Sequence, residues 1–312
     1  MFSPPVSIPE NRLDAGTLLR IKSMEMRARI IVDGFMQGLH RSPLHGTSVE
    51  FAEYREYVPG DDTRFLDWKL YARSDRYCIK KFHADTNLSA QVLVDLSGSM
   101  FYGTTGYTKA DYAKTLAATF SQFLLSQGDA VGLVTFSDQV KEVVPSLRKR
   151  GQMHSIVVGL EKSPSSADEN STDIRKSLRE IVPLLKRRGV AVLFSDLLAP
   201  AEDIKSQLSY LRSCGHDVVV FNILDPAEID FPFENLSRFE DIETGNRIYL
   251  DPRTAKETYQ KRFTAHFEGI EKFCKSLGID FYQISTADPF DVPLRNLLSE
   301  RMRLRIVRRR NG

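Results

Sequence analysis

The spacing of apolar residues changes along the chain and divides it into segments of different predicted structure. Between about residues 15 and 39 the spacing alternates between three and four, which is typical of a helix with one apolar stripe. The residues of this stripe are Ile21, Met24, Ala28, Ile31 and Phe35. From residue 91 onward, short unbroken apolar runs alternate with amphipathic segments. Because a strand buried on both faces keeps few polar positions, this alternation predicts a parallel sheet flanked by helices.

The part of the chain from residue 91 carries the elements of this predicted α/β fold. The apolar runs predict five buried strands and one short edge strand, at 91–95, 130–136, 189–196, 216–224, 279–285 and, for the edge, near 140–144. The amphipathic segments predict helices at 109–127, 154–161, 173–188, a stretch ending near 212, about 252–277 and around 293–303. A hairpin is expected over 239–250, with its turn at 244–246. Right-handed crossovers between such strands give an open, mostly parallel sheet.

The stretch before residue 91 has a different character. Residues 48–58 and 76–84 read as extended segments, and a turn-rich segment at 58–68 lies between them. We therefore expect an N-terminal helix and β-rich extension over residues 1–90. The α/β domain would then occupy residues 91–312.

Charge and composition limit the classes of partner. The chain has 43 basic and 41 acidic residues, a net charge of +2, which is too balanced for nucleic acid or an acidic membrane to bind over the whole surface. No apolar run approaches the roughly 20 residues of a membrane helix, and the first residues lack the pattern of a signal peptide. The three cysteines form no CxxC pair, which disfavours a disulfide framework or a zinc site. These features predict a cytoplasmic protein without a membrane span.

Oxygen-bearing side chains follow the first strand of the predicted sheet. The sequence VLVDLSGSM at 92–100 is apolar at first and then places Asp95, Ser97 and Ser99 within five residues. In an open parallel sheet, ligands bind beyond the carboxyl ends of the strands, and Asp196 marks the end of a later strand. Hydroxyl and carboxylate oxygens are the ligands that Mg²⁺ prefers. The sequence therefore predicts a site for Mg²⁺ (or Mn²⁺) at this edge.

Five residues are the candidate ligands of this ion. Ser97, Ser99 and Thr172, the last from a polar loop at 163–172, would supply hydroxyl oxygens. Asp95 and Asp196 would supply negative charge, directly or through bound water. An acidic side chain of another molecule would then complete the coordination. The alternative is that these Asp, Ser and Thr residues form ordinary turns and helix N-caps.

The same residues resemble the metal-ion-dependent adhesion site (MIDAS) of von Willebrand factor type A domains. The resemblance rests on Asp-x-Ser-x-Ser at 95–99, a loop threonine at Thr172 and an aspartate after a later strand, Asp196. It covers residues 91 to about 222. It implies a von Willebrand A-like fold with a metal site that binds other proteins.

A second group of charged residues lies in the segment 50–82. Its members surround a turn: Arg55, Gly60, Asp61, Asp62, Arg64, Asp67, Trp68 and Arg73. Arginine and aspartate at this density form bidentate pairs. The segment is therefore predicted to be a salt-bridged structural clasp or a partner-binding segment.

The two signals together are similar to one bacterial family. YREYVPGDDTRFLDWKLYAR, followed closely by VLVDLSGSM, resembles a domain of unknown function with a von Willebrand A-like core, and the similarity runs from about residue 38 to 301. Genes of this family typically accompany those of MoxR-type AAA+ ATPases. The resemblance implies a non-enzymatic, metal-dependent adaptor that works with a MoxR-like ATPase in assembly or maturation of a client complex.

Two other functions remain open from the residues alone. A Mg²⁺-dependent phosphohydrolase would use Asp95 as its nucleophile, and it requires a second acid or a phosphate-binding lysine near the metal. A scaffold whose site binds no metal is the other possibility. The sequence lacks the motifs of P-loop ATPases, dinucleotide-binding folds, GxSxG hydrolases and HExxH zinc enzymes.

Overall fold

The computed structural model describes residues 14–41, 53–56, 71, 77–81, 89–162, 181, 185, 188–234, 237–240 and 247–295. The chain divides into two compact units. The smaller lies within residues 36–87, and the larger comprises the parts of the chain before and after it. No helix in the described ranges is long and apolar enough to cross a membrane.

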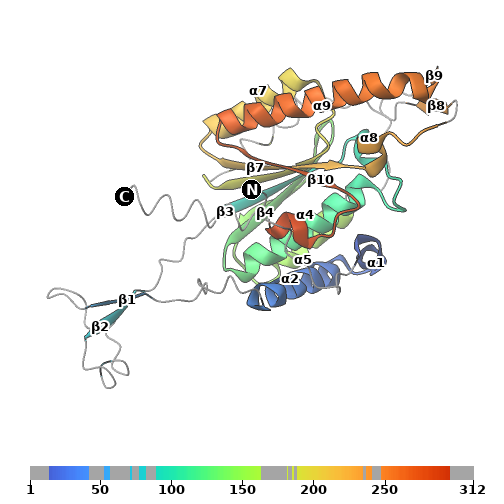
Figure 1. The fold of residues 1–312 in the computed structure, drawn as a ribbon. Coiled ribbons are helices and arrows are strands. Elements are labelled where there is room, and N and C mark those ends of the chain that lie inside the picture. Colours follow the sequence, from blue (N-terminus) through green and yellow to red (C-terminus); the bar gives the residue numbers. More distant parts are fainter. Residues whose placement is uncertain are drawn as a thin grey trace. The chain divides into compact units, whose positions relative to one another are not determined.

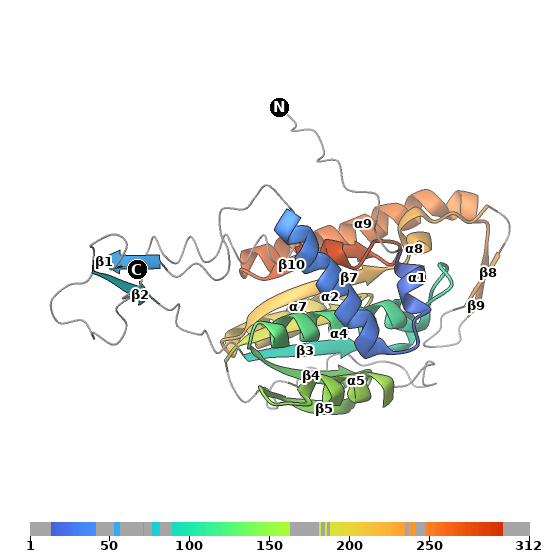
Figure 2. The ribbon, with the colours of Figure 1, turned by 90° about the horizontal axis from the view of Figure 1, so that it is seen from below.

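A six-stranded sheet forms the centre of the larger unit (Figure 2), with the strand order β10-β7-β6-β3-β4-β5. Its strands are β3 (Ser89–Asp95), β4 (Ala130–Phe136), β5 (Val140–Leu147), β6 (Val190–Ser195), β7 (Asp217–Leu224) and β10 (Asp280–Ser285). All neighbours are parallel except β4 and β5, which makes β5 an antiparallel edge strand. The predicted α/β class and the open, mostly parallel sheet are confirmed.

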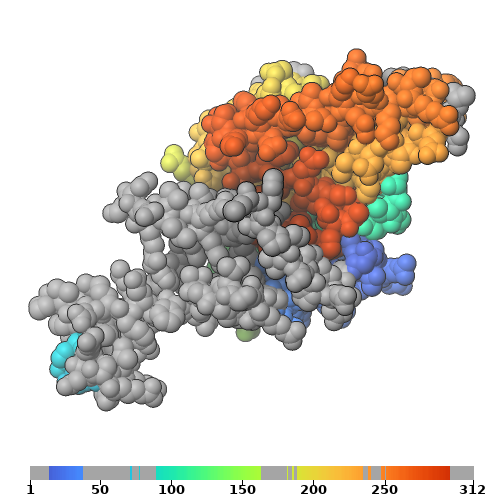
Figure 3. Space-filling model, in the orientation of Figure 1, coloured from blue at the N-terminus to red at the C-terminus, as the bar shows by residue number. Residues whose placement is uncertain are grey.

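Helices cover both faces of this sheet (Figure 1). One face carries α4 and α5, with α1 and the first part of α2 outside them, and the other face carries α7 and α9. Their bounds are α1 (Ala15–Leu19), α2 (Met24–Arg41), α4 (Lys109–Ser126), α5 (Gln152–Lys162), α7 (Ala201–Ser213) and α9 (Pro252–Ser276). Figure 3 shows α9, in orange, along the surface of this unit. The N-terminal apolar stripe is buried against α4, where the rings of Phe35 and Phe123 meet edge to face at 6.1 Å.

The N-terminal helix differs from the prediction, because it is two helices. The single helix expected over 15–39 is interrupted between Leu19 and Met24. Ser23 starts the second helix, since its hydroxyl accepts a hydrogen bond from the backbone N–H of Met26 at 3.3 Å and its carbonyl accepts from Arg27 at 3.0 Å. The apolar periodicity continues through the break, which is why it did not reveal the interruption.

A ladder of aromatic rings joins the centre of the sheet to α4. The rings of Phe194 on β6 and Phe221 on β7 stack at 5.2 Å, and Tyr282 on β10 stacks on Phe221 at 5.3 Å. Phe120 of α4 meets both phenylalanines edge to face. The three phenylalanines are completely or almost completely buried. This cluster holds the strands that carry the polar edge described below.

Two antiparallel pairs of strands lie outside the central sheet. In the smaller unit, β1 (Glu53–Glu56) pairs with β2 (Cys78–Lys81) antiparallel. In the larger unit, β8 (Ser237–Glu240) pairs with β9 (Arg247–Leu250), which confirms the predicted hairpin, although its expected turn at 244–246 lies outside the described residues. The predicted loop at 163–172 and nearly all of the predicted helix at 173–188 also lie outside them.

Replacing the central ring of the ladder will test how much this core contributes to the stability of the protein. Phe221→Ala is expected to lower the free energy of unfolding by about 3–5 kcal/mol, because it removes a buried ring and leaves a cavity. Tyr249→Ala on β9 is the matched control, since Tyr249 is 75% exposed and its loss is expected to change stability by less than about 0.5 kcal/mol. Urea unfolding followed by circular dichroism measures both, and equal effects would contradict this description of the core.

Candidate metal centre

The carboxyl ends of β3 and β6 meet where the order of the sheet reverses. From β3 the chain continues to β4 and β5 on one side and then returns to β6 on the other. In open α/β sheets this switch point is the usual place for a ligand. Asp95 is the last residue of β3, and Asp196 directly follows β6. The topology therefore brings the two predicted acids to one point.

The Asp95 carboxylate is fully buried and bridges the two strand ends. Its Oδ1 accepts a hydrogen bond from the backbone N–H of Ser97 at 2.9 Å, and its Oδ2 accepts one from the Ser195 hydroxyl at 2.6 Å. Burial and the neighbouring Asp196 carboxylate nevertheless raise the pKa of Asp95 to about 7. Two buried carboxyls side by side create a place where positive charge is stabilised.

The hydroxyls of Ser97 and Ser99 contact each other and cap no helix. Their Oγ atoms lie 3.2 Å apart. Ser97 precedes the short 3₁₀ helix η2 (Gly98–Phe101), but its side chain makes no capping hydrogen bond. The following helix, α4, is capped instead by Thr108, whose hydroxyl accepts from the N–H of Asp111 at 3.1 Å. Helix capping therefore does not account for the two serines.

A strained turn after β6 orients Asp196. Leu197 has φ = 51°, a left-handed conformation that is rare for a residue with a side chain. Its N–H donates to the Ser195 hydroxyl at 3.1 Å, and its carbonyl oxygen lies 2.8 Å from Nε2 of His266 on α9. Such a backbone costs about 1–3 kcal/mol and persists only where its surroundings hold it. The turn places the Asp196 carboxylate, which is 1% exposed, beside that of Asp95.

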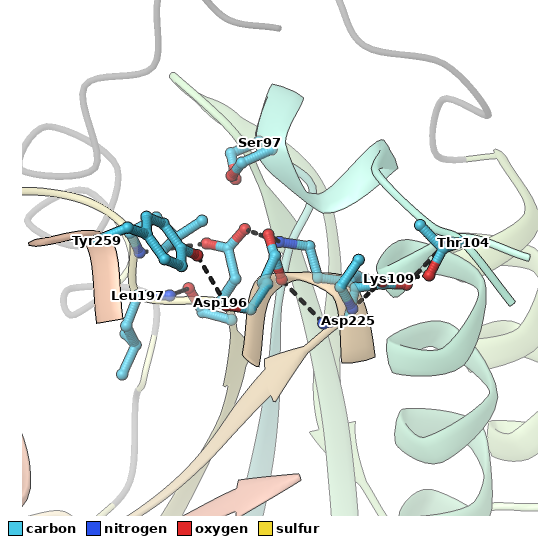
Figure 4. A network of polar contacts seen from close by, with 12 residues as sticks. Ser97, Thr104, Lys109, Asp196, Leu197, Asp225 and Tyr259 are labelled. Atoms are coloured by element: carbon cyan, nitrogen blue, oxygen red, sulfur yellow. Dashed lines mark hydrogen bonds and ion pairs between the residues drawn. The ribbon is translucent and has the colours of Figure 1, made fainter. Parts of the chain in front are cut away.

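A buried lysine that the sequence analysis did not identify completes the cluster (Figure 4). Nζ of Lys109 donates to Oδ2 of Asp196 at 2.9 Å and to Oε1 of Glu228 at 2.6 Å. Burial disfavours its charged form, but the two carboxylates outweigh burial and raise the pKa of Lys109 above its usual value. Ser97 lies apart from these contacts in Figure 4.

The short helix α8 (Pro226–Asp230) ties a further loop to this edge. Asp225, at the end of β7, caps α8 by accepting from the N–H of Ala227 at 2.9 Å. The same carboxylate accepts from the backbone N–H of Thr104 at 2.8 Å and from the Thr104 hydroxyl. Glu228 in turn accepts from the N–H of Asp225 at 2.8 Å. The loop between η2 and α4 is thereby fixed to the end of β7.

The side-chain oxygen atoms at this edge are suitable ligands for a hard divalent cation. Two carboxylates and two hydroxyls come from two adjacent strand ends, and oxygen ligands of this kind are those of Mg²⁺ and Mn²⁺. Within the described part of the chain, no group of three or more His, Cys, Asp or Glu side chains is arranged to hold a metal. A metal here would consequently need the serine hydroxyls.

The structure does not describe where the other predicted site residues lie relative to this cluster. Thr172 lies outside the described residues, so its hydroxyl stays a predicted ligand. Arg55 lies on β1 of the smaller unit. The remaining members of the charged segment also lie outside the described residues: Gly60, Asp61, Asp62, Arg64, Asp67, Trp68 and Arg73. Their role as a clasp or partner-binding segment stays a prediction.

The raised pKa of Asp95 predicts how stability changes with pH. Because the pKa is about 7 in the folded protein and 3.8 when exposed, the folded state binds more protons between these values. Its stability therefore falls as pH rises from 3.8 to about 7 and levels off above that. In chelator at pH 8, Asp95→Asn is therefore expected to be more stable than the wild type, by an amount on the order of a few kcal/mol.

Chemical denaturation from pH 4 to 8 measures this effect. Asp138→Asn is the control, because the Ser137 hydroxyl holds the pKa of the partly exposed Asp138 below its usual value. The Asp138→Asn protein is expected to keep the wild-type decline of stability with pH, whereas Asp95→Asn removes that decline. An Asp95→Asn protein with the wild-type pH profile would contradict the assignment.

Comparison with known proteins places the chain in a family. The family model described as "Protein of unknown function DUF58" matches residues 53–269. The uncharacterised protein Rv1480 of Mycobacterium tuberculosis is 24% identical over 287 residues, which covers 91% of this chain and 89% of that protein.

Two solved structures are among those similar to this chain. An aerotolerance-related membrane protein from Bacteroides fragilis has a TM-score of 0.46 at 17% identity, covering 68% of this chain and 98% of its own. The SpRpn10 VWA domain has a TM-score of 0.40 at 14% identity, covering 65% and 92%. The family match extends over more than half of the chain, from β1 into α9, and the protein belongs to the DUF58 family.

Proposed function

We propose that this protein is a metal-dependent protein-binding adaptor with a MIDAS-type site and no chemical turnover. The observation that supports it best is the pair of hydroxyls of Ser97 and Ser99, which lie 3.2 Å apart beside two buried carboxyls, with the Ser97 hydroxyl also close enough to Asp95 to lower its pKa. Hydroxyls used for turns or caps would be bound to backbone groups. These two instead lie beside each other and beside the Asp95 carboxyl, as hydroxyl ligands of a cation at the edge of the sheet would.

Mg²⁺ or Mn²⁺ is the proposed ion, and each residue has a separate task. Ser97 and Ser99 would bind it directly, with Thr172 as a third hydroxyl. Asp95 and Asp196 would hold water molecules and balance its charge, because both already accept hydrogen bonds from neighbouring groups. Few charged groups in direct contact leave the ion electrophilic, so its open position favours a carboxylate of another protein.

The proposed partners follow from this open position and from the family resemblance. A protein client would offer an Asp or Glu to the metal. A MoxR-like AAA+ ATPase is the proposed working partner, because the segment around residues 54–73 and the Asp-x-Ser-x-Ser motif together resemble the family whose genes accompany such ATPases. The complex would serve the assembly or maturation of a client complex.

The structure gives reasons to prefer this function to a phosphohydrolase that uses Asp95. A nucleophile must reach its substrate, but Asp95 is completely buried and both of its oxygens accept hydrogen bonds. Such an enzyme requires a second acid or a phosphate-binding lysine, and a lysine is present as Lys109. However, Lys109 is also completely buried, and its ammonium is bound to Asp196 and Glu228.

Calorimetry with Mg²⁺ and Mn²⁺ will test the metal site. The wild type is expected to bind one ion, and Ser97→Ala to lose at least about tenfold in affinity, because one hydroxyl ligand is removed. Ser121→Ala is the matched control, since Ser121 is a buried serine whose hydroxyl donates to the carbonyl of Ala117 within α4. Heatless titrations for the wild type would refute a metal site.

Capture of partners from the native cell will test the adaptor role. The tagged protein is expected to retain an AAA+ ATPase in Mg²⁺, and to release the client when a chelator is added or when Ser97 is replaced by Ala. The Ser121→Ala protein should behave as the wild type. Metal-dependent release of phosphate from a model phosphomonoester, lost in Asp95→Asn, would contradict the adaptor and favour the hydrolase.

A further inference from the structure

Lys109 is the first residue of α4, and its buried position is unfavourable without its partners. Its side chain is 0% exposed, and its ammonium lies 2.9 Å from Oδ2 of Asp196 and 2.6 Å from Oε1 of Glu228. Removing an ammonium from water is costly unless it is paired. The N-terminal end of a helix dipole also repels a cation. The two carboxylates therefore hold the lysine at this edge of the sheet.

The loop before α4 leaves Lys109 little freedom to withdraw. Its backbone N–H donates to the carbonyl of Tyr102 at 2.9 Å. Between them, Gly103 approaches the backbone of Tyr107 so closely that a β-carbon would collide with the Tyr107 carbonyl oxygen. Thr104 is bound to the buried Asp225 carboxylate. The ammonium is thus a fixed part of the edge that carries the candidate metal centre.

The ammonium of Lys109 is hydrogen-bonded to one of the two carboxylate oxygens of Asp196, Oδ2. The other oxygen, Oδ1, accepts from the N–H of Leu198 at 3.3 Å. A divalent ion that bound Asp196 directly would have to share Oδ2 with a positive group already in contact with it. Figure 4 shows this arrangement, in which Lys109 meets Asp196 from the α4 side.

We propose that Lys109 is a built-in competitor of the metal, which holds Asp196 out of direct coordination and keeps the affinity for the divalent cation low. This inference rests on the proposed metal site. A weakly held ion gains most from a carboxylate offered by a partner, so metal and acidic partner bind cooperatively. Glu228 forms a second ion pair with the ammonium, so Lys109 stays paired with a carboxylate when the metal attracts part of the negative charge of Asp196.

Two substitutions within this group of buried ion pairs separate the competitor role from a structural one. Lys109→Met removes the competing charge, and Mn²⁺ is expected to bind at least about tenfold more tightly. Glu228→Gln leaves the ammonium to Asp196 alone, and Mn²⁺ is expected to bind at least about threefold more weakly. Loss of structure would weaken binding in both variants. Lys261→Met, which breaks an exposed pair with Glu257 on α9, is expected to change nothing.

Electron paramagnetic resonance of Mn²⁺ at pH 8 measures both affinity and coordination. When Asp196 is released in Lys109→Met, one water bound to Mn²⁺ is expected to be replaced by the carboxylate, which the coupling to deuterated water will show. Lys109→Gln, neutral but still a hydrogen-bond donor, serves as a second variant and is expected to tighten binding as well. Thermal unfolding in chelator verifies that each variant is folded.

The outcomes distinguish this inference from the metal site itself. If the wild type binds Mn²⁺ and neither lysine variant binds it more tightly, the competitor role is overturned and the metal site stands. If no variant and no wild-type protein binds, both are overturned. Binding by the lysine variants alone supports the competitor role and contradicts metal use by the wild type.

Discussion

The burial of acidic groups where two adjacent parallel strands end is the constraint on which this structure depends. Asp95 terminates β3, Asp196 follows β6, and each is almost completely removed from water. Like charges at such depth repel each other and lack the hydration that normally stabilises them. The surrounding groups compensate in part through the Ser97 N–H, the Ser195 hydroxyl and the ammonium of Lys109. The proposed metal ion would balance the negative charge that remains.

The rest of the fold serves to hold this edge in place. The aromatic ladder across β6, β7 and β10 fixes the strands, and α4 supplies both a cap at Thr108 and the buried Lys109. The left-handed Leu197 closes the turn after β6 with support from α9. The polar network therefore rests on elements from both faces of the sheet, and its geometry is set by packing rather than by the loop sequences alone.

Part of this arrangement could be predicted from the sequence, and the reason is physical. Unbroken apolar runs are diagnostic of strands covered on both faces, and parallel strands place their carboxyl ends at one edge, so Asp95, Ser97, Ser99 and Asp196 could be grouped before any coordinates. Lys109 and Glu228 could not be assigned to this group from the sequence. A lysine in the first turn of a helix ordinarily points to solvent, and only the loop at 102–108 and the position of α8 turn this one inward. The break before Met24 was hidden for a similar reason, because a Ser cap does not interrupt apolar periodicity.

Locating a bound ion in a crystal is the sharpest test of the proposed metal site. Crystals grown with Mn²⁺ and measured near its absorption edge would give an anomalous peak at the ion. We expect one peak at the end of β3, with the hydroxyl oxygens of Ser97 and Ser99 at about 2.1 Å, the distance typical of an octahedral Mg²⁺-type site, and with the Lys109 ammonium still bound to Asp196. A protein crystallised at saturating Mn²⁺ with no peak there, or with a peak bound to other residues, would contradict it.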